Sequence, residues 1–120
     1  MSADPFSLDN AVERLLAFRD ARDWRQFHRP KELAAAIAIE AAELQELFLW
    51  KDEESADTVC GDPDRLERVT EEVADVAIYL LLLAHDLGIN LNQALERKIL
   101  LNERRYPAEQ HRGVARKAEP

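Results

Sequence analysis

LAAAIAIEAAELQELFLWK, from Leu33 to Lys51, is the stretch that decides the fold. Its apolar residues recur at helical spacing and form one stripe, made of Leu33, Ile37, Ala41, Leu44 and Phe48. Two acids, Glu40 and Glu43, lie beside this stripe instead of on a solvated face. Neither has a basic partner on the helix, because no Lys or Arg occurs between Lys31 and Lys51. We therefore expect both carboxylates to require a cation from elsewhere.

The same arrangement recurs in EEVADVAIYLLLLAHD, from Glu71 to Asp86. Glu72 and Asp75 are again three residues apart, with Tyr79 on the face of Glu72. If the two helices pack antiparallel, four carboxylates converge, and their repulsion is severe unless a multivalent cation lies between them. The alternative is two solvated acidic edges that happen to match.

The composition of the 120 residues predicts an all-α fold in a single domain, 1–120. Gly (3) and Pro (5) are scarce, and no alternating strand pattern is present. Capping and stop signals predict four helices: from Ser7 to about Ala21, from Pro30 to Lys51, from Asp62 to about Leu87 before Gly88, and from Asn90 to about Arg105.

The remaining segments are expected to be irregular. The acidic connection 51–65 is interpreted as a solvated loop without chemistry, and the tail from about 108 as mobile. The buried side of the first helix is predicted to consist of Leu8, Val12, Leu15, Leu16 and Phe18.

The third predicted helix is apolar nearly all the way round between Val76 and Leu83. Four short helices cannot bury such an element from all sides, and a helix of this kind belongs in a larger core. We therefore expect a four-helix bundle completed by oligomerisation, as a homodimer or homotetramer.

Charge and composition exclude several classes of protein. A net charge of −8 disfavours a nucleic-acid polymer as partner, since such binding depends on a basic patch. The apolar run 73–84 is too short to span a bilayer and contains Asp75. With one cysteine, Cys60, and no signal-like start, the sequence predicts a cytoplasmic protein without an internal disulfide.

Carboxylates without histidine favour a hard cation, so Mg²⁺ is preferred and Mn²⁺ is possible. A di-iron bundle would show Glu-x-x-His, and none of the three histidines follows that spacing from these acids. Lys98, Asn102 and Arg105 share a helix face, which is either a solvated basic edge or an anion clamp. Trp24 and His28, with Phe27, are either a lid over the core or a wall for a flat ligand. Metal, cation and aromatic rings together indicate a nucleoside triphosphate.

Four segments together resemble the MazG-like all-α nucleoside triphosphate pyrophosphohydrolases, most closely the small dCTP pyrophosphatase branch. They are RDWRQFHRP, IEAAELQELFLWK, EEVADVAIYL and KILLNERRYP, in that order. The resemblance covers nearly the whole chain. Glu32 departs from it, since the family usually has Asn there.

The resemblance implies cleavage between the α and β phosphates, giving a nucleoside monophosphate and pyrophosphate. The catalytic and metal-binding residues it implies are Glu40, Glu43, Glu72 and Asp75, with Mg²⁺ helping to activate water. The substrate-binding residues it implies are Trp24, His28, Trp50, Tyr79, Lys98, Asn102 and Tyr106.

The branch implies dCTP and 5-modified dCTP as substrates, in a house-cleaning role. The alternatives are a relative acting on dUTP or another non-standard nucleotide, and a non-catalytic helical interaction module with a structural ion. On the predicted helix to Lys51, Trp50 shares a face with Glu43, and we expect it to stack on the base.

Overall fold

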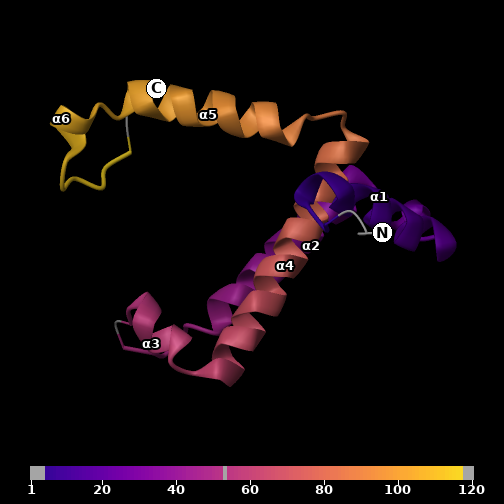
Figure 1. Cartoon of the computed structure of the whole chain (residues 1–120), viewed down its shortest axis with the longest axis horizontal. Helices are drawn as coiled ribbons and strands as arrows, with labels where there is room; N and C mark the ends of the chain where they lie inside the picture. The colour runs from indigo at the N-terminus through magenta and orange to yellow at the C-terminus, as the bar shows by residue number, and fades with distance from the viewer. Residues whose placement is uncertain (1–4, 53, 118–120) are drawn as a thin grey trace. The chain divides into compact units, whose positions relative to one another are not determined.

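The computed structural model describes residues 5–52 and 54–117, and every regular element in these residues is helical. The elements are α1 Leu8–Ala21, the 3-10 turn η1 Arg25–Phe27, α2 Pro30–Glu46, α3 Ala56–Cys60, α4 Pro63–Asp86, α5 Leu91–Arg105 and α6 Ala108–His111 (Figure 1). The all-α prediction is confirmed. The chain divides into two compact units, one ending at Leu87 and one beginning at Gly88, and each is described by itself.

Local capping explains where three of the helices begin. The side chains of Ser7, Asp62 and Asn90 each accept a hydrogen bond from the backbone N–H three residues further along. Such caps satisfy donors that the first helical turn leaves unpaired. Gly88 follows the end of α4 with φ of 69°, a left-handed conformation that glycine adopts without steric cost. The predicted starts and the stop at Gly88 are confirmed.

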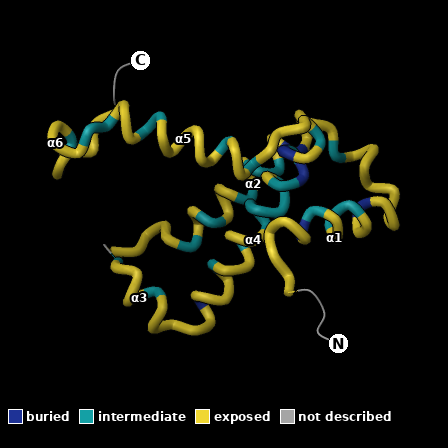
Figure 2. Tube along the Cα trace, turned by 45° about the horizontal axis from the view of Figure 1, so that its top comes forward, coloured by how far each residue is buried: buried dark blue, intermediate teal, exposed yellow. Residues whose placement is uncertain are grey.

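In the first unit, α2 packs antiparallel along α4, and α1 packs against α4 (Figure 1). The buried apolar residues are Ala11, Leu33, Leu82 and Ala84, and the partly buried positions gather where these three helices meet (Figure 2). This antiparallel pairing brings the C-terminal half of α2, with Glu40 and Glu43, opposite the middle of α4, with Glu72 and Asp75.

The predicted extension of α2 to Lys51 is wrong, because the helix ends at Glu46 and turns follow to Trp50. The carbonyl oxygen of Leu47 accepts a hydrogen bond of 2.9 Å from the guanidinium of Arg65 on α4. A cation at this end also complements the helix dipole. Trp50 has φ of 61°, so it does not continue the helical face of Glu43.

The predicted buried side of α1 is only partly correct. Leu8 and Phe18 are 72% and 48% exposed, whereas Ala11 and Arg19 are buried. Arg19 is accommodated because Asp86 accepts two hydrogen bonds from it. Ala41 on α2 and Phe48 in the turn that follows it are likewise exposed, although the sequence places them on the buried stripe.

Two short helices were not expected from the sequence. Ser55 caps α3 within the connection 51–65, by accepting a hydrogen bond from the N–H of Thr58. The segment 108–111 forms α6, where the rings of Tyr106 and His111 lie 5.1 Å apart. Among the described residues, no helix is long and apolar enough to cross a membrane.

Candidate functional site

Three of the four predicted acids meet between α2 and α4. One carboxylate oxygen from each of Glu40, Glu43 and Glu72 lies within 4.8 Å of the others. Glu40 and Glu72 are partly buried, and each has a buried Oε2 atom without a hydrogen-bond partner among the described residues. Buried polar atoms are normally paired, so these two oxygens are available to bind a ligand.

The proximity of the carboxyl groups changes how they hold protons. The pKa of Glu40 is raised, first by its contact with the carboxyl of Glu72 and then by burial. The pKa of Glu43 is raised chiefly by its contact with Glu40. Like charges this close disfavour full ionisation. Oxygen-only donors that repel one another fit a hard divalent cation, so the chemistry of these residues suits such an ion.

Asp75 borders the three-carboxylate cluster and lines a cavity of about 320 Å³. Its negative charge contributes to the raised pKa of Glu40. The cavity lies between α1 and α4, and its lining is mostly apolar and aromatic; it consists of Leu15, Phe18, Arg19, Asp75, Ile78, Tyr79 and Leu82. A pocket with apolar walls and few polar groups is typical of small-molecule sites.

Two rings that line this cavity, Phe18 and Tyr79, are the ends of a row of four rings. Successive ring centroids are 5.7 Å apart for Phe18 and Trp24, 6.5 Å for Trp24 and His28, and 6.2 Å for His28 and Tyr79, all at edge-to-face angles. Burial lowers the pKa of His28, and the positive charge of Arg19 lowers it further. The Nδ1 atom of His28 is buried without a hydrogen-bond partner in the part of the chain described. The predicted residues Trp24, His28 and Tyr79 are thus brought together.

The remaining predicted site residues lie elsewhere. Trp50 is 98% exposed, in the turn that follows α2. Lys98 and Asn102 are on α5, and Tyr106 is its C-terminal cap, so all three belong to the second unit. Their predicted contacts with phosphate or sugar stay predictions.

Two buried arginines near the site were missed by the sequence reasoning. Arg19 pairs with Asp86 beside the cavity, and Arg65 pairs with Glu54 at the end of α2. In neither pair do the two residues share a helix, so helical spacing gives no signal for them. The expectation that Asp52, Glu53 and Glu54 are solvated is wrong at Glu54, whose side chain is 17% exposed and paired with Arg65, while Glu53 lies outside the described residues.

Residues 35–119 match the MazG-like family. This chain belongs to the MazG-like family.

Curated relatives of this MazG-like chain include dCTP pyrophosphatase 1 of Bos taurus, 40% identical over 92% of this chain and 69% of that protein. The protein of the same name from Homo sapiens is 40% identical over 88% of this chain and 63% of its own length. A crystal structure of a pyrophosphatase from Archaeoglobus fulgidus shares 41% identity, with a TM-score of 0.74 over 89% of this chain and 98% of that one.

Proposed function

We propose that this MazG-like chain hydrolyses dCTP, and 5-modified dCTP, to the monophosphate and pyrophosphate in a Mg²⁺-dependent reaction. The chain is a nucleoside triphosphate diphosphatase, in keeping with its family and its relatives. The observation that carries the proposal is the cluster of three carboxylates with two unpartnered buried oxygens. Such a cluster suits a substrate that arrives with a divalent cation.

In this proposal Glu40, Glu43, Glu72 and Asp75 hold Mg²⁺, with Mn²⁺ as a possible substitute. The ion supplies charge neutralisation for the phosphates and a lowered pKa for bound water. The acids themselves concentrate negative charge at one place. This charge repels a free triphosphate anion, so the site favours a triphosphate that is bound to a metal ion. A carboxylate in this cluster also accepts the proton of the attacking water.

The base is proposed to lie against the row of rings beside the cavity. Trp24, His28 and Tyr79 offer aromatic surfaces, and Trp50 offers a fully exposed indole for stacking. Because burial lowers the pKa of His28, its ring is neutral near pH 7 and can donate from one nitrogen and accept at the other. Cytosine likewise has an amino donor beside ring acceptors.

Lys98, Asn102 and Tyr106 are proposed to contact the phosphates or sugar. Lysine and asparagine donate hydrogen bonds from N–H groups to phosphate oxygens, and a tyrosine hydroxyl can donate in the same way. These three are assigned from the family resemblance and from the face that Lys98 and Asn102 share on α5.

Assembly as a homodimer or homotetramer is proposed from an exposed stripe along α4. Leu66, Val73, Leu80 and Leu87 are spaced by seven residues and are 37%, 51%, 44% and 54% exposed. Apolar residues at heptad spacing line the seam between packed helices. A second copy of this chain offers a matching stripe, since the symmetry of a dimer pairs like surfaces.

The decisive experiment is pyrophosphate release from a panel of triphosphates with and without Mg²⁺. We expect the highest kcat/KM with dCTP or 5-methyl-dCTP, and no release in the presence of excess EDTA. A maximum with dUTP would favour the alternative nucleotide, and absence of release from every triphosphate would favour a non-catalytic helical module. The Glu43→Gln variant serves as a matched control for contaminating phosphatases.

A further inference from the structure

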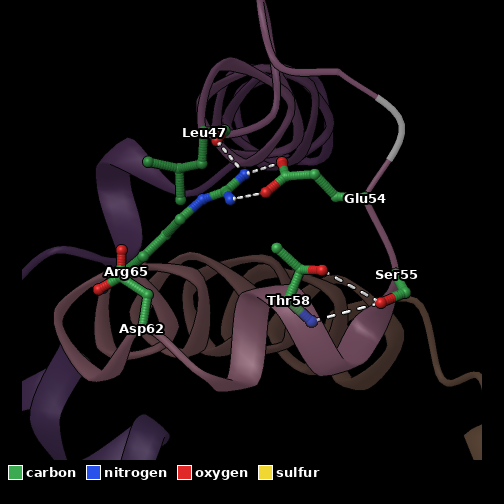
Figure 3. Close-up of polar contacts among 6 residues, drawn as sticks. All are labelled: Leu47, Glu54, Ser55, Thr58, Asp62 and Arg65. Atoms are coloured by element: carbon green, nitrogen blue, oxygen red, sulfur yellow. Dashed lines mark hydrogen bonds and ion pairs between the residues drawn. The ribbon is translucent and has the colours of Figure 1, made fainter.

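A single guanidinium fastens both ends of the segment that carries Trp50. Arg65, in the first turns of α4, donates from Nη2 to the carbonyl oxygen of Leu47 at 2.9 Å and to Oε1 of Glu54 at 2.7 Å. Its Nη1 donates to the other oxygen of Glu54. Figure 3 shows the guanidinium between the Leu47 carbonyl and the Glu54 carboxylate. Leu47 and Glu54 flank Trp50 on either side in the sequence.

The contacts of Arg65 are sheltered from water. The side chains of Arg65 and Glu54 are 9% and 17% exposed, and the guanidinium lies 5.1 Å from the ring centroid of Phe48. A two-point arginine–carboxylate contact is stronger and more directional than a single ionic contact. Residues Leu47, Phe48, Glu54 and Arg65 are called the Arg65 clasp below.

Helix caps fix the backbone of Arg65 and the backbone next to Glu54. Asp62 caps α4 by accepting from the N–H of Arg65 at 3.2 Å, which fixes the backbone from which the guanidinium extends. Ser55, next to Glu54, caps α3 by accepting from the N–H of Thr58 at 3.3 Å (Figure 3). The clasp therefore connects the end of α2 to the starts of α3 and α4.

The segment needs such a constraint, because Trp50 has little other support. Its side chain is 98% exposed, and its φ of 61° is unfavourable for a residue with a side chain. A positive φ persists only where the surrounding structure holds it. Fastening both ends reduces the conformations open to the segment, so less freedom is lost when a ligand orders the indole.

We propose that the Arg65 clasp is a positioning device for Trp50, with Arg65 and Glu54 setting the affinity for the nucleobase without touching the substrate. This inference rests on the proposed function, in which Trp50 stacks on the base. Loss of the clasp raises KM and leaves kcat nearly unchanged, because the acids that carry the chemistry lie on α2 and α4 outside the clasp.

The test compares KM and kcat for dCTP in the full chain and in its variants Arg65→Met, Glu54→Gln and Trp50→Ala, and in Arg65→Met combined with Trp50→Ala. We expect KM to rise roughly fivefold or more in Arg65→Met. This factor corresponds to the lower end of the range of binding free energy that one stacked base contributes. Trp50→Ala should raise KM at least as much, and the double variant should show no further rise. This lack of additivity is the signature of a residue that acts through Trp50.

Arg68→Met is the matched control, since Arg68 is an exposed arginine on the same helix. It should have the KM of the parent chain. Arg65→Lys should give an intermediate KM, because an ammonium lacks the fork that binds two carboxylate oxygens. If Arg65→Met does not fold, as judged by circular dichroism, Glu54→Gln tests the same clasp with a change of nearly constant shape.

Three results would overturn the inference. The first is a KM of Arg65→Met and of Glu54→Gln equal to that of the parent. The second is a pair of effects, of Arg65→Met and Trp50→Ala, that multiply in the double variant. A drop in kcat alone would also contradict it. If the parent chain releases no pyrophosphate from dCTP, the proposed function fails and the role in base affinity fails with it. Hydrogen exchange at residues 47–51, faster in Arg65→Met than in the parent, then separately establishes whether the clasp restrains the segment.

Discussion

Arg19 and Asp86, 67 residues apart in the sequence, form a two-point ion pair with both N–O distances at 2.9 Å. The pair joins α1 to the last turn of α4, with side-chain exposures of 2% and 14%. The Arg19 guanidinium holds the pKa of Asp86 below its usual range. Arg19 also lines the cavity, so its ion pair with Asp86 holds the cavity residues of α1 in position against those of α4.

Removing one partner of this pair should destabilise the protein strongly. Asp86→Ala leaves a buried guanidinium unpaired, and we expect a loss of about 3 kcal/mol in the free energy of unfolding. The double variant Arg19→Met with Asp86→Leu should lose less, because it leaves no buried charge. Urea denaturation checks both, with the exposed Glu67→Gln as control. Equal losses in the single and double variants would contradict this account.

The site acids should be dispensable for stability when metal is absent. Because their charges repel, Glu43→Gln or Asp75→Asn should leave the Tm without Mg²⁺ unchanged or higher, while abolishing triphosphate cleavage. Added Mg²⁺ should raise the Tm of the parent more than that of either variant, since it binds the folded state. Thermal melts beside a pyrophosphate assay test this. A large loss of metal-free stability in both variants would show that the acids are structural.

The acid cluster also predicts an unusual pH dependence for the metal-free protein. The folded pKa of Glu40 is raised above its ordinary value of 4.5, so folding favours its protonated form. This contribution is fully present below pH 4.5 and is lost as the pH rises through the raised folded pKa. Between pH 4.5 and the raised folded pKa of Glu40, we expect the free energy of unfolding to fall more steeply with pH in the parent than in Glu40→Gln. If the free energies of unfolding of the two proteins, measured in EDTA, change in parallel with pH, the raised pKa of Glu40 is not the cause of the pH dependence.

The predictable parts of the fold were those with local causes. Ser7, Asp62 and Asn90 cap helices through atoms three residues away, and Gly88 ends one through its own φ. The first acid pair was visible because Glu40 and Glu43 lie on one helix without a basic neighbour, and the second because Glu72 and Asp75 repeat its spacing. The end of α2 had no such local signal, and the Leu47 carbonyl that follows it accepts a hydrogen bond from Arg65, 18 residues further along the chain.

In the candidate site too, features with local causes were predictable and contacts between distant residues were not. Glu40, Glu43 and Glu72 converge because the antiparallel pairing expected from two amphipathic helices occurs. The partners of Arg19 and Arg65 could not be inferred, because charged residues are usually solvated and only packing of separate elements buries these two. The placement of Trp50 on a helical face with Glu43 was wrong because α2 ends at Glu46 and Trp50 lies in the turn that follows.

Trp50→Ala is expected to raise the KM for dCTP with little change in kcat. Loss of a stacked base should cost about 1–3 kcal/mol in binding. The exposed indole has few contacts with the protein, so the Tm should remain that of the parent. Steady-state kinetics and a thermal melt measure the two quantities. Unchanged kinetics in the folded variant would remove Trp50 from the site.

A charge within the exposed stripe of α4 should break the assembly. Leu80→Glu places a carboxylate in the proposed seam between copies, where burial of an unpaired charge is costly. We expect light scattering to give the mass of a smaller species than the parent, with Glu71→Lys as an exposed control outside the stripe. A parent chain that is a folded monomer at micromolar concentration would defeat the proposed oligomer.

The end of α2 at Glu46 has a consequence for how such an enzyme can diversify. The acids stand on two paired helices, whereas the indole proposed to stack on the base stands on the turn that follows. Turns tolerate replacement and length changes better than packed helices do. Substitutions between Leu47 and Glu54 could therefore retune which nucleotide is accepted while the hydrolytic apparatus is inherited intact, which makes this segment the natural place to begin engineering a new substrate preference.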